Sequence, residues 1–307
     1  MFADLHVHTD YSDSTRSVED VLALARACGI GLLAITDHNV LEGSQRLLDA
    51  HAPDIQRLSG VELDCVQDGT HLHVLGYGFT PDSGFREFVA NIRQRLDAMS
   101  DTLIARMAQG PIDVRNTVPA GAARGNAADN APKSILTRAP NAVQICAADY
   151  AAYTQPQPGG WKALHYLVAR GTAENLRAAV RLYGDYDVTY TKAGFPDLPT
   201  VCHEIRRAGG VPVLAHPWDS LWKNTYHAKE TQAFDLQTFV ENIKKLTPLG
   251  LGGIECHYPT HSRSVIKACL EICRQQSLIV TGGSDDHGTF WPMPTFVRPD
   301  IAQIRLR

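Results

Sequence analysis

The sequence predicts an α/β fold in which helices cover a mainly parallel sheet. Short β-like runs alternate with helix-like runs at both ends of the 307-residue chain, and this alternation is typical of βα units. The content of 44% hydrophobic and 20% charged residues is ordinary for a globular protein with a sizeable core. The net charge of -4 gives no overall preference for nucleic acid.

The N-terminal part shows the alternation most clearly. Residues 3–7 and 32–36 are strand-like, and Ser17 opens a capping box for a helix that ends near Gly29. Two more strands are expected at residues 57–63 and 71–77. The C-terminal part repeats the pattern, with expected helices at 200–208 and 235–246, strands at 211–215 and 252–256, and then a further helix and a strand at 278–281.

Residues 86–198 interrupt this pattern. A long helix-like run is followed by a sequence rich in Gly, Pro, Ala and Asn that contains no clear strand. We therefore expect one domain built from residues 1–85 and 199–307, with residues 86–198 inserted as a mostly helical cap. Within it, Trp161 begins a helix that we expect to pack the cap rather than to stack on a nucleotide base.

The sequence also predicts the compartment and the state of the cysteines. The first residues lack a basic region followed by an apolar run, and no stretch near 18 apolar residues occurs. We expect a cytoplasmic protein that has no contact with a membrane and no obligate protein partner. The seven cysteines form no Cys-x-x-Cys pair and are expected to be buried free thiols.

The strongest local signal of chemistry is Asp4-Leu5-His6-Val7-His8. Side chains alternate across a strand, so Asp4, His6 and His8 are expected to share one face. A lone histidine is usually structural. Two histidines at this spacing, with a carboxylate at a strand end, favour a metal site.

Histidines and carboxylates recur at the other expected strand ends, where barrel enzymes carry their functional groups. Each is weak alone, since Asp37, for example, could cap a helix. Together they indicate one shared site. The segments are Asp13, Thr36-Asp37-His38, Gly60-Val61-Glu62, His71-Leu72-His73, Ala215-His216-Pro217, Ile254-Glu255-Cys256-His257 and Ser284-Asp285-Asp286-His287.

The types of these residues limit the metal. Imidazole and carboxylate ligands without a thiolate suit Zn, Mn or Fe(II), and the mixture does not select among them. There are more ligands than the four that a tetrahedral ion needs. We therefore expect two or three divalent ions, with a carboxylate such as Glu62 bridging them.

At this point a family resemblance is visible. The motifs Asp-x-His-x-His, Tyr-Ser-Asp, Thr-Asp-His, Gly-Val-Glu, His-x-Leu-Gly-Tyr, Ala-His-Pro and Gly-Ser-Asp-x-His, in this order, resemble those of the polymerase and histidinol phosphatase (PHP) superfamily. The resemblance covers residues 1–80 and 199–290. It implies a distorted (β/α)7 barrel and metal-dependent hydrolysis of phosphate esters, and is strongest to stand-alone bacterial enzymes that act on nucleotides or oligonucleotides.

The resemblance also implies a role for each ligand residue. His73 is chosen over His71 because the family's histidine precedes an aliphatic pair and Gly-Tyr. Asp4 and Asp37 would orient ligand histidines from outside. The first ion would be held by His6, His8, Glu62 and Asp285, the second by Glu62, His73 and His216, and the third by Asp13, His38 and His287.

The implied reaction assigns catalytic roles to Asp13, Glu62 and Asp285. A water activated between cations would attack phosphorus, and Asp13 or a nearby histidine would protonate the leaving alkoxide. His261 and Arg263 follow the strand of Glu255 and are candidates for contact with the phosphate, with a plain surface role as the alternative.

One departure from the family pattern concerns the cap. The relatives carry Gly-Arg-Pro-His in the insertion, and this chain has no such string. Arg138 is the candidate that takes its place in binding substrate, with Arg124 as the alternative, and both match weakly.

These observations support one leading function and two alternatives. The leading function is the hydrolysis of phosphomonoesters in nucleotides or short oligonucleotides. The first alternative is a phosphatase for small metabolites of the histidinol phosphate type, against which the large cap argues mildly. The second is a metal-binding regulatory module without catalysis, against which the complete ligand set argues because decay would first remove ligands.

Overall fold

The structure is a computed structural model and describes residues 2–110, 145–155, 161–223 and 235–289. Its N-terminal part forms a parallel three-stranded sheet. The strands follow the order β1 (Phe2–Asp4), β2 (Ile30–Ala34) and β3 (Gln56–Leu58). Helices α1 (Val18–Ala27) and α2 (Glu42–Asp49) connect them, and Ser17 forms the predicted capping box, with Asp20 as its partner.

The second sheet has five strands in chain order. They are β4 (Gly60–Gln67), β5 (Thr70–Tyr77), β6 (Val211–Leu214), β7 (Gly253–His257) and β8 (Ile279–Gly282). Strands β6 to β8 pair in parallel, as predicted, but β4–β5 and β5–β6 are antiparallel. Four of the six strand pairings are thus parallel, which agrees with the expected mainly parallel sheet, and β4–β5 is antiparallel because Asp68-Gly69, both at positive φ, closes a two-residue hairpin.

Backbone contacts join the two sheets at two places, one between the segments that follow β1 and β8 and one between the segment that follows β2 and strand β4. Leu5 N donates to Gly282 O at 3.2 Å, and Val7 forms a parallel bridge with Asp286. At the other place, His38 forms a parallel bridge with Glu62. These contacts bring the ends of β1, β2, β4 and β8 together, while closure into a seven-stranded barrel stays a prediction.

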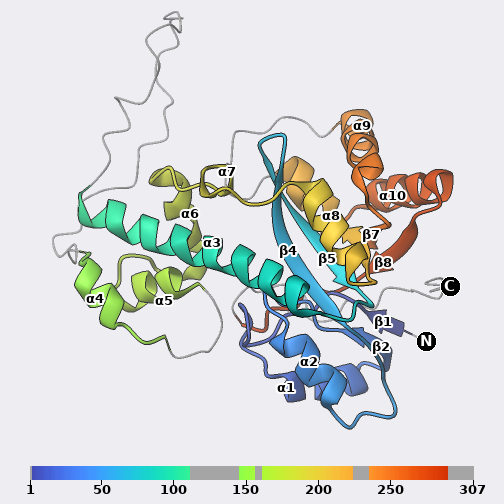
Figure 1. The fold of residues 1–307 in the computed structure, drawn as a ribbon, viewed down its shortest axis with the longest axis horizontal. Helices are drawn as coiled ribbons and strands as arrows, with labels where there is room; N and C mark the ends of the chain where they lie inside the picture. The colour runs from blue at the N-terminus through green and yellow to red at the C-terminus, as the bar shows by residue number, and fades with distance from the viewer. Residues whose placement is uncertain (1, 111–144, 156–160, 224–234, 290–307) are drawn as a thin grey trace, which may run out of the picture.

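Three helices cover the five-stranded sheet: α8 (Leu198–Arg207), α9 (Leu236–Leu246) and α10 (Arg263–Gln276) (Figure 1). Asp197 caps α8, and its buried side chains recur at helical spacing. A short π-helical turn, η2 (Asp219–Lys223), follows β6, and a 3₁₀ turn, η3 (Thr247–Leu249), follows α9. All seven cysteines are free thiols, and five are buried.

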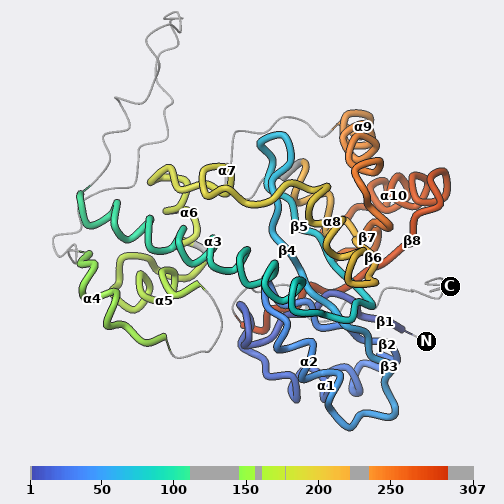
Figure 2. The backbone as a smooth tube through the Cα atoms, viewed as in Figure 1, coloured from blue at the N-terminus to red at the C-terminus, as the bar shows by residue number. Residues whose placement is uncertain are grey.

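The described residues between β5 and α8 form helices that lie to one side of the sheets (Figure 2). The longest, α3 (Ser83–Ala108), begins at the Asp82 cap and buries Phe85, Val89 and Ile92 at spacings of three and four. The shorter helices are α4 (Ala147–Ala152), α5 (Lys162–Ala169), α6 (Leu176–Asp185) and α7 (Tyr190–Ala193).

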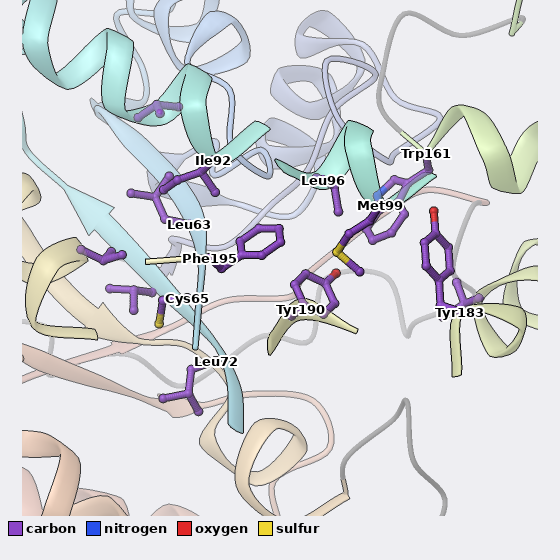
Figure 3. Close-up of a cluster of buried hydrophobic side chains, with 14 of the residues drawn as sticks. Leu63, Cys65, Leu72, Ile92, Leu96, Met99, Trp161, Tyr183, Tyr190 and Phe195 are labelled. Atoms are coloured by element: carbon purple, nitrogen blue, oxygen red, sulfur yellow. The ribbon is translucent and has the colours of Figure 1, made fainter. Parts of the chain in front are cut away.

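This helical segment shares a hydrophobic core with the β4–β5 hairpin. Figure 3 shows Leu63 of β4 beside Ile92 of α3, with Cys65 of β4 and Leu72 of β5 further along the hairpin in the same cluster. Trp161 belongs to the same core and is buried, which confirms the prediction that it packs this segment. The outer face of the hairpin therefore depends on α3 and its neighbours for cover.

The described part of the chain contains no helix that is both long and apolar enough to cross a membrane.

Candidate metal centre

The structure brings all nine predicted ligand residues together in one site, some beyond the ends of strands and some within β4 and β5. Their side chains are buried or nearly so, and they come from the segments after β1, β2, β6 and β8 and from the strands β4 and β5. They are His6, His8, Asp13, His38, Glu62, His73, His216, Asp285 and His287.

The first predicted group forms a close set of four ligand atoms. His6 Nε2 lies 3.1 Å from Glu62 Oε2 and 3.1 Å from Asp285 Oδ1. His8 Nε2 lies 3.2 Å and 3.0 Å from the same two oxygens. His8 Nε2 and Asp285 Oδ1 are both buried, and although they lie 3.0 Å apart they do not form a hydrogen bond. Two imidazole nitrogens and two carboxylate oxygens that converge in this way fit a divalent cation.

The second predicted group lies on the other oxygen of Glu62. Glu62 Oε1 is 2.9 Å from His73 Nδ1 and 3.0 Å from His216 Nε2. The two imidazole nitrogens lie 3.1 Å apart. Glu62 therefore faces one group of histidines with each of its oxygens, as a bridging ligand must.

The third predicted group surrounds Asp13. Its Oδ2 lies 3.3 Å from His287 Nε2 and 3.7 Å from His38 Nε2. His8 also joins this group, because its Nδ1 lies 3.3 Å from Asp13 Oδ1 and its ring stacks on that of His287. His8 is thus shared between the first and third groups, a role that the sequence did not indicate.

The charges in the cluster support one another. Burial lowers the pKa of His6, but attraction from Asp285 and the neighbouring carboxylates outweighs it and raises the pKa well above its ordinary value. Burial also opposes ionisation of Glu62, whose pKa is nevertheless held well below its usual range by His38 and other histidines. Burial lowers the pKa of His38 itself to about 4. Divalent cations would supply the positive charge that these carboxylates need when the histidines are neutral ligands.

The backbone is strained at two ligand positions. Asp285 adopts a φ of 55° and His216 a φ of 22°, which L-residues rarely do. Such strain is tolerated where the surrounding structure fixes it, and it gathers at functional sites.

The two carboxylates predicted to orient histidines contact the backbone or hydroxyl groups instead. Asp4 Oδ1 accepts from the backbone N–H groups of His6 and Ser284, and burial raises its pKa to about 6. Asp37 accepts from Thr9 and Ser12. Both therefore hold the loops that carry ligands, rather than the imidazole rings.

Two other carboxylates contact ligand imidazoles. Glu255 Oε1 lies 3.0 Å from His6 Nδ1, and Glu255 Oε2 accepts from the backbone N–H of His216 at 2.7 Å. Asp64 Oδ1 lies 3.1 Å from His73 Nε2. The signal for Asp64 was its position two residues after Glu62, which places both side chains on one face of β4.

The three residues predicted to contact the substrate differ in their positions. His261 is buried at 7% exposure, with Nδ1 3.0 Å from Cys256 O and Nε2 without a partner. Its ring lies next to that of Tyr258, whose hydroxyl donates to Asp285 Oδ2 at 2.7 Å. Arg263 is exposed at the start of α10. Arg138 lies outside the described residues.

Sequence comparisons place this site in a known context. The model of the PHP domain matches residues 4–135. A phosphoribosyl 1,2-cyclic phosphate 1,2-diphosphodiesterase of Eggerthella lenta is 25% identical over 300 residues, which cover 96% of this chain and 97% of the relative. A 5'-3' exoribonuclease of Haemophilus influenzae is 26% identical over 216 residues, which cover 70% of this chain and 68% of the relative.

Solved structures share the fold. A proposed metal-dependent phosphoesterase from Bifidobacterium adolescentis aligns with a TM-score of 0.66 and 22% identity over 97% of this chain and 92% of that one. An amidohydrolase from Chromobacterium violaceum aligns with a TM-score of 0.64 and 21% identity over 97% and 94%. Residues 4–135 therefore match the PHP domain, and the histidine and carboxylate cluster, together with the relatives named for cleavage of phosphate diesters and RNA, agrees with a metal-dependent hydrolase.

Proposed function

We propose that this protein hydrolyses a phosphate ester of a nucleotide or a short oligonucleotide, using two or three divalent ions of Mn, Zn or Fe. The observation that carries the proposal is the position of Glu62, which faces a separate group of histidines with each carboxylate oxygen. This arrangement supports ions held side by side, which suits displacement at phosphorus.

The nine predicted ligands would hold the ions in the three groups described above. Bound divalent ions lower the pKa of water and offset negative charge on a phosphoryl group. Asp285 and Glu62 contribute by keeping their charge in a buried site, since their pKa values lie well below the usual range.

The same reasoning separates two roles proposed for Asp13. Burial opposes its ionisation, but His287, His38 and His8 hold its pKa well below the usual range. A carboxylate that holds no proton near neutral pH is a ligand or a base, rather than an acid. We therefore assign Asp13 to ion binding. We place His261 at the phosphate or the leaving group, because its Nε2 has no partner and its ring lies beside Tyr258, which donates to Asp285.

The choice of substrate rests on what the matched relatives have in common. The relative from Eggerthella lenta is named for a cyclic ester of phosphoribose and that from Haemophilus influenzae for cleavage of RNA. Both substrates are phosphate esters of ribose. The match over 96% of this chain also favours a second candidate function, the opening of a cyclic ribose phosphate diester.

The test is a substrate panel with manganese-loaded protein. It contains 5′- and 3′-mononucleotides, 3′,5′-bisphosphates, short oligonucleotides, histidinol phosphate and a 1,2-cyclic phosphoribose. Release of inorganic phosphate reports monoester hydrolysis, and ³¹P NMR reports ring opening, which releases none.

The variant for this panel is Asp285→Asn, because asparagine tolerates the left-handed backbone at this position. Asp68→Asn is its matched control, since Asp68 also has a positive φ but is exposed in the hairpin turn. Turnover that is lost only in Asp285→Asn supports the proposal. Intact ion content without turnover of any member of the panel would refute it.

A further inference from the structure

Asp64 is a buried carboxylate that none of the three proposed ion groups uses. It is 1% exposed and lies opposite His73 in the antiparallel pairing of β4 with β5. Burial opposes ionisation of Asp64, but hydrogen bonds with His71 and His73 outweigh it and hold its pKa well below the usual range. A buried charge of this kind is costly unless its partners are fixed.

The two ring nitrogens of His73 face different carboxylates. Nδ1 lies 2.9 Å from Glu62 Oε1, and Nε2 lies 3.1 Å from Asp64 Oδ1. An imidazole that gives its Nδ1 lone pair to a cation carries its proton on Nε2. Asp64 is the acceptor for that proton, so it selects the tautomer in which Nδ1 is available to the ion.

The oxygens of Asp64 are already occupied by donors from the protein. Oδ1 also lies 2.6 Å from His71 Nε2, and Oδ2 accepts from the side-chain amide of Asn39. Asn39 in turn accepts from Asp64 N at 3.1 Å, with a backbone φ of 54°. These contacts define the direction of the carboxylate, and they distinguish Asp64 from an ion ligand with a free oxygen.

The arrangement continues into the helical segment. The ring of His71 stacks on that of Tyr190 in α7, with centroids 3.5 Å apart and planes 10° apart. A series of contacts therefore runs from Glu62 through His73, Asp64 and His71 to Tyr190.

We propose that Asp64 is a positioning residue that orients His73 for the second ion, and that His71, stacked on Tyr190 of the helical segment, holds Asp64 in place. The proposal rests on the proposed function in one respect, the assignment of Glu62, His73 and His216 to an ion. Carboxylates that hold ligand histidines in this way change ion affinity by about 10- to 100-fold when they are removed.

The test measures ion binding rather than turnover. Metal-free wild type, Asp64→Asn, His73→Ala and the double variant are titrated with Mn²⁺ by calorimetry, and bound ions are counted by mass spectrometry. Asp64→Asn is expected to weaken the same class of ions that His73→Ala removes, by about 10- to 100-fold. Asp68→Asn, the same change of charge in the turn of this hairpin, is expected to bind ions like the wild type.

The double variant separates positioning from a general structural role. If Asp64 acts through His73, Asp64→Asn has no further effect on ion binding once His73 is alanine. His71→Ala keeps the charge of Asp64 but removes one of its donors, and it is expected to weaken the same class of ions by less. This variant keeps the proposal testable if Asp64→Asn does not fold.

Two results would overturn the positioning role: wild-type ion affinity in Asp64→Asn, or additive losses in the double variant. Either would leave the proposed hydrolysis intact. Conversely, the expected ion binding without turnover of any ester in the panel would overturn the hydrolysis and leave the positioning role in place.

Discussion

The ends of the strands and the helical segment are both largely buried, yet they are built from different residues. The strand ends bury histidines and carboxylates, which contact one another at 2.9–3.7 Å. The helical segment buries aromatic and aliphatic side chains such as Trp161, Leu164 and Tyr183. Each imidazole or carboxylate at the strand ends has a specific partner, whereas the core of the helical segment depends on shape and volume. Substitutions at the strand ends should therefore reduce ion binding and hydrolysis, whereas substitutions in the helical segment should reduce stability.

The largest expected effect is that of Glu62→Gln. Glutamine keeps the shape but removes the charge that faces two groups of histidines, so hydrolysis should fall by about a thousandfold. Ions of both groups should also be lost, as measured by mass spectrometry. Glu87→Gln, on the exposed side of α3, is the control. Loss of ions from only one group would show that Glu62 does not bridge.

Leu164→Ala tests the helical segment. Leu164 is fully buried in α5, so its truncation should lower the free energy of unfolding by about 3 kcal/mol. Chemical denaturation would measure this change. The number of bound ions should stay the same in the folded protein, and its decrease would show that the two regions cannot be separated.

Loss of one ion should lower stability by slightly less than the Leu164→Ala substitution. Ligands that bind only the folded state stabilise it by about 2.7 kcal/mol at a free concentration one hundred times Kd. A chelator should lower the melting temperature by an amount that corresponds to this free energy for each ion site. Hydrolysis should cease. An unchanged melting temperature with ions demonstrably removed would contradict the proposed ligands.

The last expected effect is a pH dependence of the metal-free protein. Burial lowers the pKa of His73, but Glu62 and Asp64 outweigh it and raise the pKa to about 10. A histidine whose pKa is raised by folding stabilises the folded state fully below its unfolded value, about 6.5. That stability is lost as the pH rises through about 10.

Melting temperatures of the metal-free protein measured from pH 6 to 10 should therefore decline. The decline should be smaller in His73→Ala, which lacks the titrating group. Equal declines in the two proteins would show that other groups are responsible.

The sequence predicted the ligand cluster because strand alternation and strand ends determine where side chains meet. His6 and His8 share a face through their spacing, and Asp285 lies in the loop that follows β8. The antiparallel hairpin was missed although Asp68-Gly69 is a strong turn signal. Convergence of these segments on one metal site could thus be anticipated without knowing how each strand pairs, whereas the choice of the nine ligands depended on the family resemblance.

Other parts of the site could not be predicted for a physical reason. The roles of Asp64 and Glu255 depend on which ring nitrogen they face, and this is determined by tertiary packing. The packing of α3 against β4 and β5 joins residues distant in sequence. No periodicity encodes such a partner, and Arg138 lies outside the described residues.

The core shared by α3 and the β4–β5 hairpin has a consequence for protein engineering and for evolution. Leu63, Cys65 and Leu72 alternate along the hairpin with Glu62, Asp64 and His73, so one face binds α3 while the other carries ligands. A graft that replaced the helical segment with a short loop would expose the apolar face of the hairpin. Relatives are therefore expected to change this segment by substitution, rather than by its loss.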